Sequence, residues 1–403
     1  MKEICPLIDC TGCQACRQIC PRSAIQMLEN EKGHIYPSID QSLCIDCGLC
    51  LKHCPSLNSI EKREPQRVIA GWINDFKIRM SSTSGGISYA LSRMIVSEGG
   101  YFCGVVWDNG KRGTRHEITN DINRLSDFQG SKYSHSETFD VFQRIKMLLQ
   151  RNDTVLFAGT PCQVAGLKSF LQKNYENLYT VDLICHGVPS RKILRERIEY
   201  MEQNSGKRLL SLASREKTPN QYSTSTKYFF DDGSSTYVSN DKDPMFRCFV
   251  ENFCLRPNCF RCQYAQKSRC SDFTIGDFWG YEAHSLRFRS YRKGTSAILI
   301  NTEKGARLFQ SIEHELIWEE RNFHEVSSCN RNLTKPQMKP EKYDEFWKRY
   351  SSGEQLQNLT LEYFPPQDRK ISYSHELKIF IKMLLPSSLL EQLKKYYYVY
   401  KFR

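Results

Sequence analysis

After about position 67, the apolar residues fall into short continuous runs, separated by amphipathic stretches and by glycine-rich or polar turns. Runs rich in β-branched and aromatic residues predict strands, at Val68–Trp72, Tyr101–Trp107, Thr154–Ala158, Val181–Cys185 and Ala297–Asn301. Apolar residues spaced three and four apart predict helices, at Ile87–Glu98, at Phe139–Gln150, within Gly159–Leu171 and from about Lys304. Because strand, turn and helix recur in this order, we expect a mixed α/β body with functional loops at its strand ends.

Three segments have a different pattern. Short runs at Ala24–Met27 and His34–Ile39, with Gly33 between them, predict a hairpin. The polar stretch Asn58–Gln66 predicts a linker. Residues Ser211–Asp243 are rich in Ser, Thr and Tyr, which indicates antiparallel strands or an insertion.

Two cysteine runs occupy the first sixty residues, and each has the spacing C-x-x-C-x-x-C-x-x-x-C-P. This spacing is typical of 4Fe-4S clusters, and in two-cluster ferredoxins the fourth cysteine of each run serves the other cluster. Zinc sites close with ligands in two pairs and do not require this tandem pattern. We therefore expect cluster one on Cys10, Cys13, Cys16 and Cys54, and cluster two on Cys44, Cys47, Cys50 and Cys20.

Length and composition place these cysteines in a larger protein. With 403 residues, the chain needs a second, larger body after the first sixty positions. There are eighteen cysteines but no apolar run of signal-peptide length before the first cluster ligands, which favours a reducing compartment, the cytoplasm. The sequence contains no run of eighteen apolar residues, so it predicts no transmembrane helix.

The net charge of +12 is unevenly distributed. Residues 1–60 carry five Lys and Arg against six Asp and Glu, so residues 61–403 carry +13. A basic body can attract a phosphate-bearing coenzyme, an acidic redox partner or a membrane surface. Nucleic acid is disfavoured, because no recognition motif accompanies the charge. The basic, aromatic-rich tail His375–Arg403 is expected to dock on a membrane or a partner, or to fold back on its own core.

Two loops and a third cysteine group are candidates for cofactor chemistry. The STSGG turn at 82–86 precedes a predicted helix, so it either presents backbone N–H groups to an anion or acts as a plain N-cap. The GSKY turn at 130–133 offers a cation and a ring that suit a flavin or a phosphate. Read from spacing alone, the third group forms a compact thiolate site for iron–sulfur or zinc, on Cys254, Cys259, Cys262 and Cys270.

In order along the chain, the motifs GSKY, GTPCQVAGLKSFL, VDLICHGVPS, C-x-x-C and IGDFWG resemble the coenzyme F420 hydrogenase/dehydrogenase beta-subunit family, where F420 is a deazaflavin. The resemblance implies a body that binds FAD and a further 4Fe-4S cluster. For this cluster three it implies Cys162, Cys185, Cys259 and Cys262, and it leaves Cys254 and Cys270 as core thiols. Flavin binding is implied for the matching loop positions Ser84, Gly85, Gly86, Gly130, Ser131, Lys132, Tyr133, Gly159 and Thr160.

The expected fold class is α+β, with a bacterial-type dicluster ferredoxin domain followed by a mixed α/β flavin-binding body. The expected domains are the ferredoxin domain at 1–60, a linker at 61–66, the body at 67–345 and a basic amphipathic C-terminal region at 346–403. A nicotinamide-linked Rossmann fold is disfavoured, since no G-x-G-x-x-G motif opens a βαβ unit.

These expectations together suggest an electron relay. Two-electron chemistry at FAD, with coenzyme F420 or another small molecule, would feed single electrons through the clusters to a redox partner protein or a small carrier. Lys132 would hold negative charge near the reduced ring, and His186 would transfer protons unless it is a structural hydrogen-bonding residue. The alternatives are an electron-transfer subunit with no substrate of its own, docked on a catalytic partner, and a zinc-structured scaffold.

Overall fold

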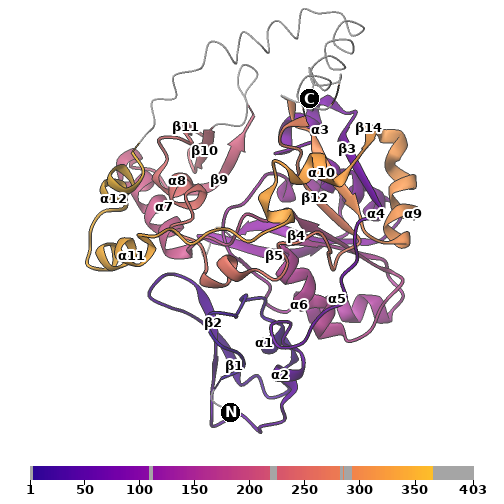
Figure 1. The fold of residues 1–403 in the computed structure, drawn as a ribbon, viewed down its shortest axis with the longest axis horizontal. Coiled ribbons are helices and arrows are strands. Elements are labelled where there is room, and N and C mark those ends of the chain that lie inside the picture. The colour runs from indigo at the N-terminus through magenta and orange to yellow at the C-terminus, as the bar shows by residue number, and fades with distance from the viewer. Residues whose placement is uncertain (1–2, 109–111, 218–224, 282–284, 286–292, 366–403) are drawn as a thin grey trace, which may run out of the picture.

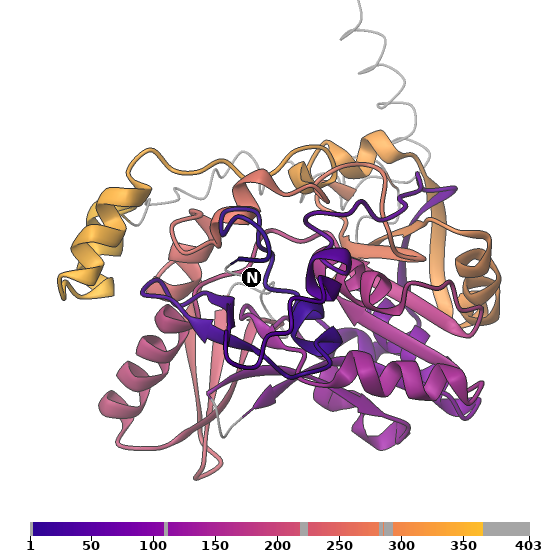
Figure 2. The same cartoon turned by 90° about the horizontal axis from the view of Figure 1, so that it is seen from below.

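The computed structural model describes residues 3–108, 112–217, 225–281, 285 and 293–365. A small N-terminal ferredoxin domain lies against a body made of a large sheet and a second, smaller lobe (Figure 1). Seen from below, the ferredoxin domain lies across the middle of the body (Figure 2). The α+β expectation, with a ferredoxin-type domain followed by a mixed α/β body, is confirmed.

The ferredoxin domain contains one antiparallel hairpin and two short helices, namely α1 (Ala15–Ile19), β1 (Ile25–Glu29), β2 (Ile35–Ile39) and α2 (Leu49–Lys52). Gly33 turns the hairpin with a φ of +76°. A Cβ at this position would lie 2.5 Å from the backbone nitrogen of Lys192, so the hairpin tip contacts the second lobe closely. The predicted hairpin is confirmed.

Within the described residues, the body holds a nine-stranded sheet in the order β14-β3-β13-β12-β8-β7-β4-β5-β6. Its strands are β3 (Arg67–Ile73), β4 (Tyr101–Asp108), β5 (Gly113–Thr119), β6 (Ser136–Glu137), β7 (Val155–Gly159), β8 (Leu178–Leu183), β12 (Phe273–Asp277), β13 (Ser296–Ile300) and β14 (Leu316–Arg321). The central strands β4, β7, β8 and β12 are parallel neighbours, and the strands beyond β12 are antiparallel. The carboxyl ends of β7, β8 and β12 therefore meet at one edge, where loops can build a site.

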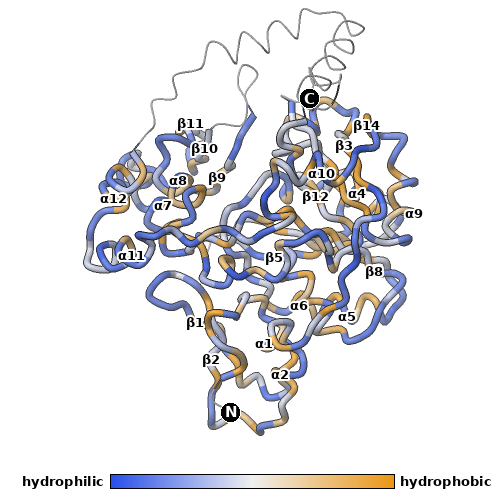
Figure 3. The backbone as a smooth tube through the Cα atoms, viewed as in Figure 1, coloured by the Kyte–Doolittle hydropathy of each residue, from blue (hydrophilic) through white to orange (hydrophobic). Residues whose placement is uncertain are grey.

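Helices cover both faces of this sheet. On one face α4 (Ile87–Ser97) and α9 (Glu303–Ile312) pack together, and on the other lie α5 (Val141–Gln150) and α6 (Pro161–Leu171). Alternate residues of one strand serve the two faces, since Phe102 packs with the first pair and Cys103 with the second. Hydrophobic residues accordingly concentrate in the sheet and in the helices that cover it (Figure 3).

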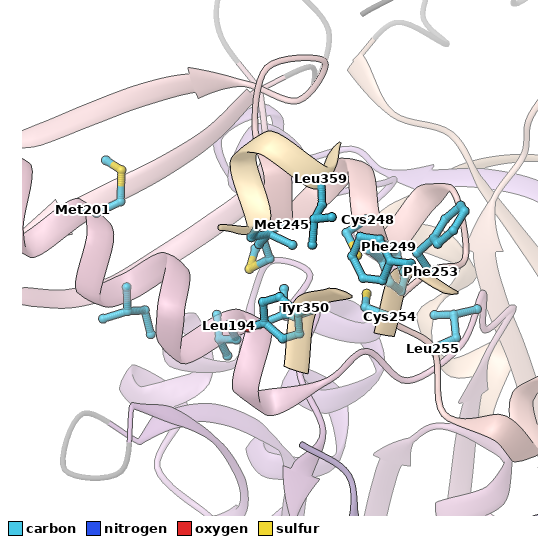
Figure 4. Close-up of a cluster of buried hydrophobic side chains, with 14 of the residues drawn as sticks. Leu194, Met201, Met245, Cys248, Phe249, Phe253, Cys254, Leu255, Tyr350 and Leu359 are labelled. Atoms are coloured by element: carbon cyan, nitrogen blue, oxygen red, sulfur yellow. The ribbon is translucent and has the colours of Figure 1, made fainter. Parts of the chain in front are cut away.

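As far as the structure describes it, the second lobe is an antiparallel three-stranded sheet with four helices, which confirms antiparallel strands between positions 211 and 243. Its elements are α7 (Arg191–Ser205), β9 (Leu209–Glu216), β10 (Ser225–Phe230), β11 (Ser235–Ser239), α8 (Pro244–Val250), α11 (Tyr343–Ser351) and α12 (Leu356–Tyr363). The remaining elements are α3 (Phe76–Ser81), α10 (Phe323–Ser327) and the 3-10 turns Ile122–Phe128, Pro257–Arg261, Glu313–Glu315 and Arg331–Leu333. The core of this lobe joins its own helices to the loop that carries Cys254 (Figure 4).

The expected boundary between residues 345 and 346 falls inside α11 and is corrected by the structure. Phe346 and Trp347 are fully buried in the core of the second lobe, and the Trp347 N–H donates to the carbonyl of Phe253 at 2.8 Å. From the sequence, this helix was assigned to the C-terminal region because the chain end is rich in basic residues. The predicted amphipathic tail 375–403 lies outside the described residues, in which no helix is long and apolar enough to cross a membrane.

A seam of buried polar contacts joins the ferredoxin domain to the body. The side-chain amide of Gln14 donates to Glu137 Oε2 at 2.9 Å. Gln18 donates to Thr138 Oγ1 at 3.1 Å, and its own Oε1 accepts from the backbone N–H of Phe142 at 2.8 Å. Because these groups are buried, each bond replaces one to water that folding removes. The two parts are therefore held in a fixed orientation.

Trp347→Ala tests the corrected boundary. We expect the free energy of unfolding to fall by about 3–5 kcal/mol, because the change removes a large buried ring and leaves the Phe253 carbonyl without its donor. Met338→Ala is the control, because this side chain is 67% exposed, and it should change the free energy of unfolding by less than about 0.5 kcal/mol. Chemical denaturation measures both. Equal, small effects would show that α11 does not belong to the core.

Candidate functional site

A cavity of about 1720 Å³ lies between the main sheet and the second lobe. It sits at the carboxyl ends of β7, β8 and β12, and residues of β11, α8 and α12 close its other side. Of the predicted flavin residues, the cavity is lined by Ser84, Gly86, Gly130, Ser131, Lys132, Tyr133, Gly159 and Thr160. Gly85 lies behind this lining, where its N–H donates to Ser296 Oγ at 2.9 Å.

The two predicted loops meet at the rim of the cavity. The backbone N–H of Ser131 donates to Thr83 Oγ1 at 2.8 Å, which ties the GSKY turn to the STSGG turn. Gly86, with a φ of +84°, is the N-cap residue of α4. The positive end of this helix therefore faces the cavity, as an anion site requires. Ser134 Oγ also lines the cavity and has no hydrogen-bond partner among the described residues, so it remains available to a bound group.

Lys132 is held by its own turn. Its Nζ donates to the carbonyl of Gln129 at 2.8 Å, and burial lowers the pKa of the ammonium to about 8. The neighbouring Tyr133 does not offer a free ring, because it packs against Phe246 and Phe249 of the second lobe with centroid separations of 5.7 and 4.5 Å. The GSKY turn thus anchors the cavity walls to each other as well as lining them.

Both ring nitrogens of His186 are engaged. Nε2–H donates to the carbonyl of Phe249 at 3.2 Å, and Nδ1 accepts from the side-chain amide of Gln337 at 3.1 Å. Burial lowers the pKa of the ring below its ordinary value. These contacts favour the structural role for His186, because neither nitrogen is left to exchange a proton with a substrate.

Arg215 lines the cavity and was missed by the sequence analysis. Its guanidinium forms an ion pair with Asp277 at 2.6 Å and lies 5.0 Å from the ring centroid of Trp279. Asp277 and Trp279 belong to the IGDFWG motif that was singled out, whereas Arg215 sits in a strand with no local motif. Only the packing of β9 against the end of β12 reveals it.

The four thiols predicted for cluster one are grouped in the structure. Cys10, Cys13, Cys16 and Cys54 all line one enclosed cavity of about 20 Å³, together with Cys5. The Cys5 thiol donates to Cys10 and Cys54 and holds their pKa values near 7 and 6 respectively. A set of four thiols around one small cavity fits the ligand chemistry of a 4Fe-4S cluster.

The thiols predicted for cluster two lie at the outer end of the domain. Burial raises the pKa of Cys50, and Cys47 and Cys20 add to the rise, so these thiols are neighbours. Cys47 is exposed, Cys20 and Cys44 are half-buried and Cys50 is buried, whereas all four cluster-one thiols are buried. Cluster two would therefore lie nearer the solvent than cluster one.

Cys162, Cys185, Cys259 and Cys262 also come together, although more than seventy residues separate the two pairs. Burial raises the pKa of Cys185 well above its usual value, and Cys259, Cys162 and Cys262 each raise it further. Cys162 occupies the first turn of α6 after Thr160, whose Oγ1 lies 3.1 Å from Cys162 Sγ. Cys185 follows β8 and lines the large cavity.

The remaining two cysteines of the local quartet are placed differently. Cys254 interacts with the Cys248 thiol in the apolar core of the second lobe (Figure 4). The Cys270 thiol contacts the carbonyl of Pro161 at 3.7 Å and is buried in the core beside α6. Within the described residues, no three His, Cys, Asp or Glu side chains lie close enough to hold a single metal ion. A cubane cluster binds its four thiolates at separate iron corners, so its ligands do not need to converge on one point.

The thiols predicted for cluster one and for cluster three approach each other across the seam. A Cβ on Gly166 of α6 would lie 2.8 Å from the Cβ of Cys13, so a glycine is needed for this approach. The buried ring of Tyr264 belongs to the same core cluster as Cys13, Cys162 and Cys262. Burial raises the pKa of Tyr264, and nearby Cys270, Cys162 and Cys13 add to the rise. Thiols of both groups therefore lie near one buried ring.

Comparison with known proteins supports the predicted family. Residues 152–326 match the family model for the C terminus of the beta subunit of coenzyme F420 hydrogenase/dehydrogenase. Residues 9–58 match the 4Fe-4S dicluster domain. The resemblance drawn from the motifs is confirmed, and the chain is an iron–sulfur protein with a dicluster domain ahead of this region.

Two individual likenesses are weaker. The pyruvate synthase subunit PorD of Methanocaldococcus jannaschii is 38% identical over 60 residues, which is 14% of this chain and 64% of that relative. This chain therefore spans less than two thirds of the relative it matches. A chain of the F420-reducing [NiFe] hydrogenase complex from Methanosarcina barkeri is similar at 17% identity, over 66% of this chain and 85% of that chain. Its TM-score is 0.44, and a likeness at that level carries no argument.

Single cysteine variants test the assignment of cluster three. Cys162→Ala and Cys185→Ala should each lower the iron content from about twelve to about eight per chain, because a cubane holds four irons. Cys254→Ala and Cys270→Ala are the matched controls and should retain all of the iron. Iron and sulfide are measured after anaerobic purification. The reverse result would assign the cluster to the local quartet.

Proposed function

We propose that this chain, which joins a 4Fe-4S dicluster domain to a C-terminal region of the coenzyme F420 hydrogenase/dehydrogenase beta-subunit family, is an iron–sulfur flavoprotein oxidoreductase. It moves electrons between a two-electron donor or acceptor in the large cavity and a partner at the ferredoxin domain. The observation that carries the proposal is the order of the thiol groups. Cys185 lines the cavity, Cys13 packs on the helix of Cys162, and Cys47 is exposed at the far end.

The cavity suits FAD in size and in chemistry. Its volume of about 1720 Å³ exceeds the roughly 300–1,000 Å³ of common ligand sites, which leaves room for a dinucleotide and a second planar molecule. The start of α4 at Gly86 would hold the phosphates, and Lys132 would place a positive charge beside them or beside the ring. When bound, FAD would supply two-electron chemistry and the clusters single-electron transfer.

The surface near cluster two suits a protein partner. Ile45 is 59% exposed and Leu43 is 44% exposed, and both flank Cys44. Exposed apolar side chains beside a surface cluster provide contact area for a redox partner without lengthening the electron path. We propose that the partner is a redox protein or a small electron carrier that binds here, in a reducing compartment such as the cytoplasm.

Coenzyme F420 is the substrate that the family description favours, and another small two-electron carrier is the alternative. A second candidate function is an electron-transfer subunit without a substrate of its own. The engaged nitrogens of His186 favour this alternative, because they remove the most obvious proton-transfer group from the cavity.

Cofactor content and bleaching test the proposal. We expect anaerobically purified protein to contain about twelve irons and one FAD per chain, and its flavin absorbance to bleach on addition of reduced coenzyme F420 alone. Bleaching by dithionite but not by small two-electron donors would favour the electron-transfer subunit. Colourless protein that releases neither iron nor flavin would overturn both.

Lys132→Met tests flavin binding. We expect the affinity for FAD to fall about tenfold, because the change removes a cation from the cavity wall. Lys242→Met is the control, since Lys242 lines the same cavity but is exposed. Fluorescence titration of the deflavinated protein measures both affinities. If both variants bind FAD as the unchanged protein does, Lys132 does not contact the cofactor.

A further inference from the structure

Arg256 reaches from the body across the seam into the ferredoxin domain. It lies three residues before Cys259 and is 1% exposed. Its Nη1 donates to the carbonyl of Cys10 at 3.1 Å, and its Nη2 donates to the carbonyl of Ile35 at 2.6 Å. The guanidinium also lies over the ring of Tyr36, 4.6 Å from its centroid.

No carboxylate of the described residues forms an ion pair with Arg256, and its Nε has no hydrogen-bond partner among them. Two other buried arginines behave differently. Arg197 pairs with Asp243 at 3.4 Å, and Arg269 pairs with Asp182 at 3.1 Å. Removing a cation from water costs several kcal/mol unless a negative charge compensates it. Arg256 therefore needs an anion that these contacts do not supply.

The groups around Arg256 that can carry negative charge are thiols of two clusters. On the ferredoxin side, Nη1 reaches the carbonyl of Cys10, and Gly12 of the same cysteine run lies against Nη2. On the body side, Arg256 belongs to the loop of Cys259, whose backbone N–H donates to the carbonyl of Arg256 at 2.9 Å, and its charge acts on the Cys259 and Cys162 thiols. One cation thus acts on ligands of cluster one and cluster three together.

The first cysteine run leaves space for this guanidinium. A Cβ on Gly12 would lie 2.7 Å from Nη2 of Arg256, and Gly12 has a φ of +70°. Both the conformation and the space therefore require glycine between Cys10 and Cys13. The loop that caps cluster one is shaped around a side chain that comes from the loop of cluster three.

We propose that Arg256 is the shared counter-charge of cluster one and cluster three, which raises the reduction potential of both and holds them in register across the seam. The inference rests on the proposed function only for the presence of the clusters. A cube bound by four thiolates carries net negative charge that grows on reduction, so a fixed cation beside it favours the reduced form. Because the cation is buried, solvent screens this effect little.

Arg256→Gln in the full chain tests the proposal by anaerobic redox titration monitored by electron paramagnetic resonance. We expect the reduction equilibrium of clusters one and three to become at least tenfold less favourable, which is about 59 mV for one electron. Cluster two, at the outer end of the domain, should shift less. The cluster-three signal is assigned by its loss in the Cys185→Ala variant. Arg256→Lys keeps the charge, and it should keep the reduction potentials of both clusters within about 59 mV of those in the unchanged protein.

Arg197→Gln is the matched control, because it removes a buried arginine from the second lobe that has its own carboxylate. It should leave all three potentials unchanged. Full iron content with unchanged potentials in Arg256→Gln would overturn the proposal. If Arg256→Gln loses iron, the Arg256→Lys variant decides the question. Clusters retained at near-native reduction potentials support the role of charge. Loss of the clusters, or a tenfold shift of their reduction equilibrium, overturns it. Unchanged protein without iron would overturn the proposed function, whereas clusters without flavin would leave this test intact.

Discussion

The rest of the structure depends on the buried contact between the first cysteine run and helix α6. Cys13 lies against Gly166, and Cys162 occupies the first turn of the same helix. Electron transfer between two clusters requires short separations through packed protein, and in the proposed function this contact would provide one. The seam bonds of Gln14 and Gln18 keep the approach in place, since each satisfies a buried polar group.

Burial divides the thiols into an interior part and an exposed part. The ligands predicted for cluster one are buried, those for cluster three are half-buried with Cys185 at the cavity, and Cys47 meets the solvent. In the proposed function, this gradient separates the two sides of exchange, with a small molecule in the cavity and a protein at the ferredoxin tip. The body and the ferredoxin domain would then form one electron path with two ends.

The sequence alone predicted much of the fold and less of the site. The two cysteine runs are local patterns, so spacing was enough to find them, and the strands of the main sheet followed from short apolar runs before turns. The pairing of Cys162 and Cys185 with the C-x-x-C loop came only through the family resemblance, because nothing local joins residues that far apart. Arg256 and Arg215 carry no motif, and only tertiary packing distinguishes them from surface arginines. Helix α11 was misassigned because its charged residues hide Phe346 and Trp347.

The carboxylate of Glu137 on β6 has a consequence for how the molecule can move. One oxygen accepts from Gln14 of the ferredoxin domain, and the other accepts from Arg191 at the start of α7, at 2.5 Å. The carboxylate of Glu137 therefore connects the ferredoxin domain, the main sheet and the second lobe. If the second lobe moves to admit a ligand to the cavity, it must break the Glu137–Arg191 contact or move the ferredoxin domain with it, so ligand entry and the spacing of the proposed electron path would be linked.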